Sequence, residues 1–275
     1  MILGYLCIIA LTIQSGNSRE IKPANCRRVY DKYDRQKIAS RNFLYGKVWP
    51  DNVIPYEIAP GYDTFDQMII KRAMKHISDG VCVKWKPRSG ETNYVRINHD
   101  ELGCFTTMGY DSIRGMHNLN LQRTIGQTTC MRMGIAAHEM LHVMGFDHEH
   151  SRPDRNKYVK VKWENMDPRF YAEFFRDLLF GSKEHLPICD PKSPKKSFDD
   201  CYSGYVTETF GMDYDYGSIM HYGLKKCSLK DQEIMLVLKD VPIGTTIGEM
   251  KEMSKLDVQK ARAKYGCDGP TPPKT

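Results

Sequence analysis

The sequence predicts an α+β domain, and three observations support this fold class. A helical pattern begins near residue 63, a series of short strand-like segments follows it up to residue 122, and two further helical segments come later, of which the first is rich in histidine. The chain shows no internal repeat and no sign of a second domain of this kind. We therefore expect one main domain in which helices and strands occupy separate stretches of the chain.

The first helix is predicted from a cap and from apolar spacing. Asp63 or Thr64 can cap its N-terminus, because a side-chain oxygen there accepts a hydrogen bond from a backbone N–H of the first turn. The apolar residues that follow recur at intervals of three and four: Ile69, Ile70, Ala73, Met74 and Ile77. This spacing indicates a helix with one face in the core.

Four short strands are predicted after this helix, near residues 81–85, 94–97, 103–108 and 118–122. The histidine-rich helix is expected at about residues 134–144. A last helix is expected to begin after Ser254, because Ser254 and Asp257 have the spacing of a capping box, and to end near Gly266.

Residues 138–149, HEMLHVMGFDHE, contain the side chains of a catalytic zinc site. His138 and His142 are four residues apart, so both imidazoles lie on one face of a helix and can reach one ion. Zinc lowers the pKa of its bound water to about 7, and Glu139 stands beside it as the general base. Glu139 would take the proton and later pass it to the leaving amine.

A third ligand cannot come from the same helical face without distortion, so the chain must turn. Gly145 accepts a positive φ and ends the helix, which lets His148 reach the metal. Three nitrogen ligands leave a position open for water, whereas structural zinc is usually enclosed by four protein ligands. The H-E-x-x-H pattern alone is a weak signal, but Gly145 and His148 at fixed offsets make it specific.

Two segments resemble the astacin family of secreted metzincin endopeptidases. Residues 138–156 follow the family pattern H-E-x-x-H-x-x-G-F-x-H-E-x-x-R-x-D-R-D with one departure, Asn156 in the place of the last Asp. Residues 216–222, YGSIMHY, follow the pattern of the family's Met-turn, S-x-M-H-Y. The resemblance covers most of the chain, from about residue 48 to residue 267.

This resemblance implies a metzincin-like catalytic domain of two subdomains. A twisted N-terminal sheet would lie above the cleft, the zinc-binding helix along its floor, and an irregular C-terminal half that ends in a helix below it. The strand around Cys104, Phe105 and Thr106 would form the upper rim, where an extended protein or peptide substrate adds as an antiparallel strand.

The resemblance also implies roles for three residues outside the H-E-x-x-H pattern. Tyr222 would be a fifth zinc ligand that swings away to hydrogen-bond the oxyanion during the reaction. Met220 would lie beneath the metal as a packing base. Glu149 would receive the α-amino group of the processed chain, a pair that exists only after activation.

Residues 1–18 are predicted to be a signal peptide. The apolar run at residues 2–13 is too short to span a bilayer comfortably, and Gly16 and Ser18 are placed for signal peptidase. Cleavage near Ser18 would release a secreted, extracellular protein, whereas an uncleaved anchor is the alternative. No other segment approaches 18 apolar residues, so no membrane partner is expected.

Residues 19–41 form a short basic prosegment. They hold eight Lys or Arg against three Asp or Glu, which accounts for most of the formal charge of +6, so a nucleic-acid partner is not expected. A solvated arm is the other interpretation. An activating protease that cuts after Arg41 would place Asn42 at the start of the catalytic domain, residues 42–267, and a Pro-rich tail, 268–275, follows.

The sequence leaves open how this leader would keep the enzyme latent. Prosegments of the family usually block zinc through an Asp of an F-x-G-D stretch, which is missing here. Asp31, Asp34 or the thiolate of Cys26 could substitute as an anionic ligand, or the leader is too short to inhibit.

Nine cysteines become eight if Cys7 leaves with the signal peptide, and an even number in a secreted chain implies disulfides. By the resemblance to astacins, Cys82 pairs with Cys267 and Cys104 pairs with Cys130.

The four other cysteines are additional to the family set. Cys189 and Cys201 flank a loop rich in Lys, Pro and Asp and are expected to bridge each other. Cys26 either pairs with Cys227, which would keep the leader tethered after cleavage, or leaves Cys227 as a lone thiol. The segment 181–204 either lines the lower rim of the cleft and biases substrate choice or is a solvated surface loop.

The sequence thus predicts a secreted zinc metalloendopeptidase that is made as a zymogen, acts on proteins or peptides and carries one catalytic Zn²⁺. We expect a monomer. The alternative is a latent protein that keeps the metzincin fold and binds without turnover, but Glu139 and Tyr222 are both intact and favour the enzyme. Another zincin, such as an N-terminal exopeptidase, is a third possibility, although no residue marks a site for reading a chain terminus.

Overall fold

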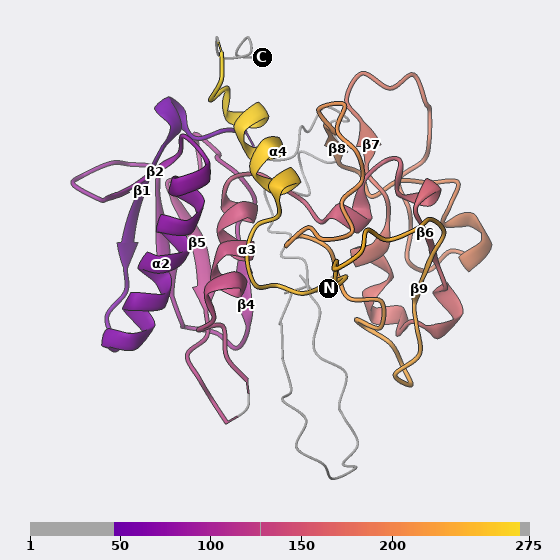
Figure 1. Ribbon diagram of the computed structural model, residues 1–275, viewed down its shortest axis with the longest axis horizontal. Coiled ribbons are helices and arrows are strands. Elements are labelled where there is room, and N and C mark those ends of the chain that lie inside the picture. The colour runs from indigo at the N-terminus through magenta and orange to yellow at the C-terminus, as the bar shows by residue number, and fades with distance from the viewer. Residues whose placement is uncertain (1–46, 127, 270–275) are drawn as a thin grey trace.

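A five-stranded sheet packed with helices forms one half of the molecule, and irregular chain with short strands forms the other (Figure 1). The structure is a computed structural model and describes residues 47–126 and 128–269. The predicted signal peptide, the prosegment and nearly all of the Pro-rich tail lie outside the described residues. The α+β composition agrees with the fold class that the sequence predicts.

The sheet has the order β2-β1-β3-β5-β4, and every neighbouring pair is parallel except β4 with β5. Its strands are β1 (Val53–Ile58), β2 (Lys84–Pro87), β3 (Tyr94–Asn98), β4 (Cys104–Thr106) and β5 (Met116–Leu121). Four of them were expected from the sequence, with bounds shifted by up to three residues. The sequence analysis missed β1, because Pro55 interrupts its pattern and proline weakens any strand assignment.

Helix α2 (Thr64–Gly80) covers one face of the sheet and packs against α3. The predicted cap is confirmed: Asp63 accepts a hydrogen bond from the backbone N–H of Asp66, and the Asp66 side chain accepts one in return from the Asp63 N–H. The predicted core face is also confirmed, since Ile69, Ile70, Ala73, Met74 and Ile77 are all buried.

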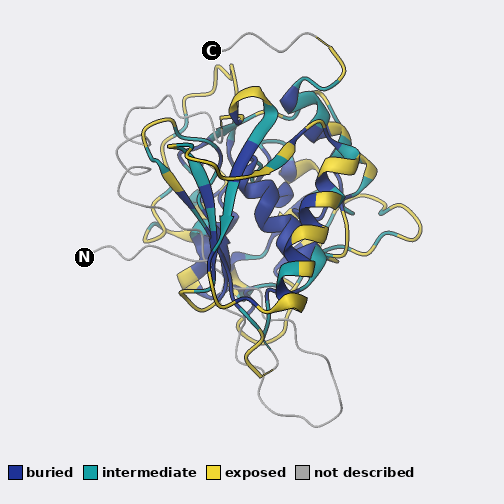
Figure 2. Cartoon of the chain, turned by 90° about the vertical axis from the view of Figure 1, so that its left-hand side faces the viewer, coloured by how far each residue is buried: buried dark blue, intermediate teal, exposed yellow. Residues whose placement is uncertain are grey.

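Helix α3 (Met133–Val143) has no solvent-exposed face. Every residue from Gly134 to Val143 is buried, so the helix is dark blue in Figure 2. Two distant aromatic side chains satisfy the carbonyl groups at its C-terminus: Trp49 Nε1–H donates to Val143 O at 2.9 Å, and the Tyr265 hydroxyl donates to Met144 O at 3.1 Å. Gly145 follows with φ of 84°, as predicted for the turn that ends this helix.

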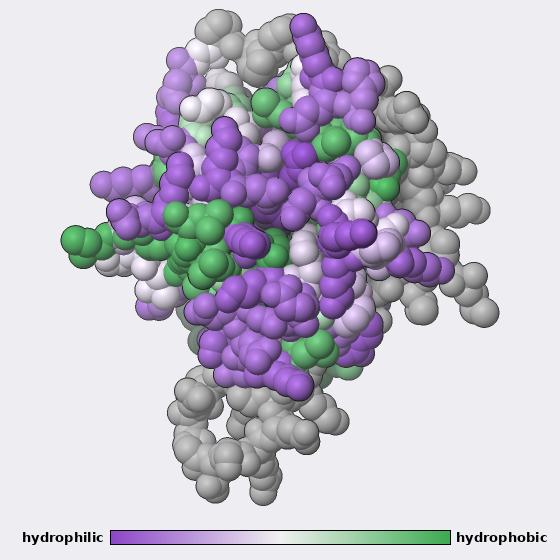
Figure 3. Space-filling view, turned by 90° about the vertical axis from the view of Figure 1, so that its right-hand side faces the viewer, coloured by the Kyte–Doolittle hydropathy of each residue, from purple (hydrophilic) through white to green (hydrophobic). Residues whose placement is uncertain are grey.

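The C-terminal half is irregular, as expected. It contains two small sheets, the antiparallel pair β6 (Val159–Val161) with β9 (Met235–Val237) and the parallel pair β7 (Leu178–Leu179) with β8 (Val206–Thr207). Short 3₁₀ helices connect them: η2 (Glu149–Ser151), η3 (Arg155–Lys157), η4 (Trp163–Asn165), η5 (Pro168–Phe174) and η6 (Lys195–Ser197). A separate aromatic core fills this half. Its outer side is largely hydrophilic, with hydrophobic side chains gathered in patches (Figure 3).

Helix α4 (Lys255–Tyr265) lies at the top of Figure 1, between the two halves. Its predicted capping box is present, and Gly266 ends it in the left-handed region, with φ of 62°. Among the described helices, none is long and apolar enough to cross a membrane.

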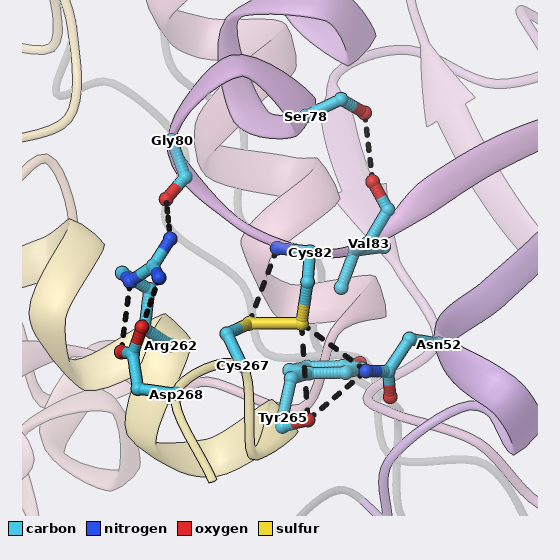
Figure 4. The surroundings of a disulfide bond; sticks show 9 residues. All are labelled: Asn52, Ser78, Gly80, Cys82, Val83, Arg262, Tyr265, Cys267 and Asp268. Carbon is cyan, nitrogen blue, oxygen red and sulfur yellow. Dashed lines mark hydrogen bonds and ion pairs between the residues drawn. A yellow bond between two sulfur atoms is a disulfide. The ribbon is translucent and has the colours of Figure 1, made fainter.

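A disulfide between Cys82 and Cys267 joins the end of α4 to the N-terminal half (Figure 4). Hydrogen bonds reinforce the junction: Arg262 Nη1 donates to Gly80 O at 3.2 Å, and Asn52 Nδ2 donates to Tyr265 O at 3.0 Å. The bond closes a separation of 185 residues and so restricts the unfolded chain strongly.

Two other disulfides link described residues. Cys104 and Cys130 join β4 to the segment before α3, and Cys189 and Cys201 close a loop between β7 and β8. Cys227 is also disulfide-bonded, so it is not a lone thiol. The prediction concerning Cys26 lies outside the described residues.

The first turn of α3 touches the backbone before α4 so closely that only glycine fits. A Cβ added at Gly134 would lie 2.0 Å from Met250 O and 2.6 Å from Lys251 O. We predict that Gly134→Ala lowers the free energy of unfolding by at least about 1–3 kcal/mol, because rigid backbone must move. Denaturant unfolding checks this, with Gly269→Ala as a control in open space; equal stability of the two variants would contradict the packing.

Candidate metal centre

Three histidines converge at the end of α3. His138 and His142 are one helical turn apart, with ring centroids separated by 4.7 Å. After the turn at Gly145, His148 returns to them, so that its Nε2 is 3.2 Å from Nε2 of His142. One nitrogen from each of the three rings lies within 4.8 Å of the others, which is the only such group of His, Cys, Asp or Glu in the described part of the chain.

Backbone carbonyls orient two of these rings. Nδ1 of His138 is 2.8 Å from Ile219 O, and Nδ1 of His142 is 2.6 Å from Phe146 O. A carbonyl only accepts, so each Nδ1 carries the proton and each Nε2 presents its lone pair to the centre. This is the usual way in which a second partner fixes a histidine for metal binding.

The chemistry of the centre fits zinc. Burial, followed by the neighbouring His142, lowers the pKa of His138 to about 3, so its imidazole is neutral, the form that binds metals. Nε2 of His138 is buried and has no hydrogen-bond partner among the described residues. Three imidazole nitrogens are a typical donor set of catalytic zinc.

Glu139 lies on α3 between the two histidines of the helix. Its side chain is 1% exposed, and burial raises its pKa well above the usual value. Its Oε1 has no hydrogen-bond partner within the described residues. A buried carboxyl oxygen without a partner is costly, and such groups are found where chemistry requires them.

The Met-turn, residues 216–222, contacts this centre through Ile219 and is held by α4. Asp257 accepts hydrogen bonds from the Ser218 hydroxyl at 2.6 Å and from the Ile219 N–H at 2.8 Å. The carbonyl oxygen of Ile219 in turn accepts a hydrogen bond from Nδ1 of His138. Burial raises the pKa of Asp257 to about 6. Met220 is buried in the core cluster that contains α3. Asp257 was assigned only a capping role from the sequence, and its contact with the turn was not anticipated.

Tyr222 and His150 pack beside the third histidine. The Tyr222 ring is fully buried, with its centroid 4.3 Å from that of His148 and 4.4 Å from that of His150. His150 is completely buried, and its Nε2 is 3.2 Å from Glu173 O. The sequence carries no periodic signal for its burial, because it lies in a 3₁₀ turn.

Glu149 forms a buried ion pair that the sequence analysis did not anticipate. Its Oε1 is 2.6 Å from Nζ of Lys260 and 3.2 Å from Nη1 of Arg152, and it also accepts the Asp215 N–H at 2.8 Å. Lys260 lies 111 residues away on α4, so no spacing rule could connect the two.

Strand β4 carries the predicted substrate rim. Cys104, Phe105 and Thr106 are its three residues; they pair with β5 on one side and pack close to α3. β4 ends the strand order, so its other edge has no partner strand in the described ranges. An unpaired edge beside the histidine helix is able to accept an additional strand.

The fold and the centre together define a metzincin-type protein. The model of the peptidase family described as Astacin matches residues 42–178 and 191–266. The chain therefore belongs to the astacin family, which confirms the resemblance found in the sequence.

Individual relatives agree with this assignment. The chain is 31% identical over 222 residues to zinc metalloproteinase nas-15 of Caenorhabditis elegans, covering 80% of this chain and 33% of that protein. It is 32% identical over 239 residues to astacin-like metalloprotease toxin 2 of Loxosceles intermedia, covering 86% of this chain and 78% of the toxin. Among solved structures, high choriolytic enzyme 1 of Oryzias latipes, a hatching enzyme zinc-protease, superposes with a TM-score of 0.61 at 26% identity, covering 79% of this chain and 92% of that one.

The chain spans only part of several relatives, between 33% and 52% of the length of four nematode zinc metalloproteinases. Residues 179–190 lie between the two stretches matched by the family model. They lead into the loop closed by Cys189 and Cys201, and many of them line a surface hollow of about 900 Å³. No predicted metal ligand lines that hollow.

We predict that one Zn²⁺ per chain stabilises the protein. At a free zinc concentration 100 times the Kd, binding adds about 2.7 kcal/mol, which corresponds to a rise in Tm of roughly 5–10 °C for a domain of this size. Calorimetry after chelation and zinc re-addition measures this shift. His142→Ala should abolish it, and the exposed His185→Ala should not; an identical Tm of the wild type with and without zinc would refute the site.

Proposed function

We propose that this protein is a secreted, zinc-dependent endopeptidase that is made as a zymogen and hydrolyses peptide bonds in proteins. The observation that carries the proposal is the buried set of three histidines on and after α3, with the unpaired carboxyl oxygen of Glu139 between them. Membership of the astacin peptidase family supports the same activity.

The histidines, Glu139 and Tyr222 have different roles in the proposed reaction. When bound by His138, His142 and His148, zinc supplies a Lewis acid that activates water and polarises the scissile carbonyl. Glu139 would take a proton from the attacking water and pass it to the leaving amine, so no covalent acyl-enzyme would be needed. Tyr222, packed on His148, is suited to a fifth ligand position and to hydrogen-bonding the developing oxyanion.

The edge of β4 is proposed as the binding site for substrate. An extended peptide would pair with Cys104, Phe105 and Thr106 through backbone hydrogen bonds, which place its scissile bond over the histidines. Backbone pairing depends little on side chains, so many sequences would be accepted. The segment 181–204, whose first ten residues lie outside the stretches matched by the family model, is proposed to bias this choice from the lower rim.

Secretion and maturation complete the proposal. We propose that residues 1–18 are a signal peptide, 19–41 a removable prosegment, 42–267 the catalytic domain and 268–275 a tail. Three disulfides among the described residues support an extracellular location, since such bonds persist in oxidising compartments.

The leader is further proposed to remain attached after cleavage. Cys227 is disulfide-bonded, and the six other cysteines in the described ranges pair with one another. Cys7 would leave with the signal peptide, so Cys26 is the candidate partner within the chain.

For the general base, we predict that Glu139→Gln lowers kcat by about 10²–10⁴-fold, because the amide cannot accept the proton. Zinc content should stay at one ion per chain, since the three histidines remain. Cleavage of a quenched peptide library after limited trypsin measures the effect. Undiminished cleavage by the variant would exclude this mechanism, and a wild type that binds zinc yet cleaves nothing would favour a latent binding protein.

For the oxyanion, we predict that Tyr222→Phe lowers kcat by about 10²-fold and changes KM little, because its hydroxyl would act in the transition state. The ring keeps its packing on His148, so Tm should not change. Tyr171→Phe is the matched control in the same half of the protein, because the buried Tyr171 hydroxyl has no hydrogen-bond partner among the described residues. A higher KM with an unchanged kcat would assign Tyr222 to substrate binding instead.

For the tether, mass spectrometry of a non-reduced digest should detect a peptide pair that joins Cys26 to Cys227 and disappears on reduction. Cys227→Ser should release the cleaved leader without reductant. Alkylation of Cys227 in the unreduced protein would contradict both the bond and the tether.

A further inference from the structure

A buried lysine from the last helix forms an ion pair next to the metal centre. Nζ of Lys260 is 2.6 Å from Oε1 of Glu149, and the two residues are 7% and 6% exposed. Lysine is almost never buried unless it is paired, because its charge loses hydration there. The position of Lys260 therefore depends on Glu149, and the reverse also holds.

Glu149 has further donors besides Lys260. Oε1 also accepts from Arg152 Nη1 at 3.2 Å and from the Asp215 N–H at 2.8 Å. The Arg152 guanidinium is shared with Asp154, whose Oδ1 is 2.9 Å from its Nε. Glu149 thus already has an ammonium, a guanidinium and a backbone N–H, the partners that a buried carboxylate requires.

Glu149 is connected to the metal centre in two ways. It directly follows His148, and its own N–H donates to Met220 O at 3.1 Å, so one residue is tied both to the third histidine and to the Met-turn. Lys260 lies one turn after Asp257 on α4, and Asp257 holds the same Met-turn through Ser218 and Ile219. Two neighbouring charged residues of α4 therefore support the floor of the centre.

We propose that Lys260 is a positioning residue that supplies, from within the chain, the cation that Glu149 needs. The third histidine is then in place for metal binding whether or not a processed α-amino group reaches this pocket. This inference rests on the proposed zymogen and refines it: activation depends on removal of the leader and not on the new N-terminus. It replaces the expectation that Glu149 waits for the α-amino group.

The test compares two N-termini, in the wild type and in variants of α4. Cleavage of the full-length protein after Arg41 gives an N-terminus at Asn42, and the same cleavage of a protein with Gly-Ser inserted before Asn42 gives an N-terminus two residues longer. The zinc Kd and the Tm of each cleaved product are then measured. The wild type should give the same values for both N-termini. Lys260→Met should raise the zinc Kd by about 10–100-fold, as loss of a supporting contact does, whereas Lys260→Arg should restore it. Lys255→Met, exposed on the same helix, is the control.

The double variant Glu149→Gln/Lys260→Met separates charge pairing from packing. It should recover Tm relative to Lys260→Met, because no buried carboxylate is then left without its ammonium. A double variant as unstable as the single one would reduce Lys260 to a packing role and overturn the proposal. So would a wild type whose zinc affinity falls with the extended N-terminus, or an unchanged Kd in Lys260→Met.

These measurements need no substrate. A wild-type protein that binds zinc and cleaves no peptide would refute the proposed function, yet the zinc affinities would still decide the role of Lys260.

Discussion

The complete burial of α3 is the constraint on which the rest of the structure depends. A helix without a solvent face cannot leave its polar side chains to water, so each imidazole must find a partner in the protein. His138 and His142 use the carbonyls of Ile219 and Phe146, which fixes both rings with Nε2 toward a common point. The buried oxygen of Glu139 is left without such a partner in the described residues, and this observation underlies its proposed role as general base.

The partners of α3 come from parts of the chain that are far apart in sequence. Trp49 and Tyr265 satisfy the carbonyls at its end, and Asp257 holds the turn that carries Ile219. Helix α4 can do this only if it stays docked, and the Cys82–Cys267 disulfide fastens its end to the N-terminal half. The metal centre is therefore a product of both halves of the molecule, although its ligands come from one short segment.

Two further features lie around that centre. The family model matches on both sides of residues 179–190, where the chain leads into the Cys189–Cys201 loop of the C-terminal half. Lys260 adds a charge at the base of the centre, next to Glu149. The geometry of the centre is the basis of the proposed reaction, while the loop and the lysine are the basis of the proposals on substrate choice and maturation.

The sequence by itself determined those features whose cause is local. Helical spacing and caps predicted the start of α2 and both ends of α3 and α4 to within one residue. The offsets of His142, Gly145 and His148 from His138 predicted that the three histidines converge, because one turn of helix brings the first two together and the turn at Gly145 returns the third. Tertiary structure alone decided the rest. Strand β1 exists despite Pro55 because two neighbouring strands pair with it, and Lys260 meets Glu149 across 111 residues because α4 docks on the Met-turn. Contacts between distant segments leave no periodic trace in a sequence, so they emerge only when the chain has folded.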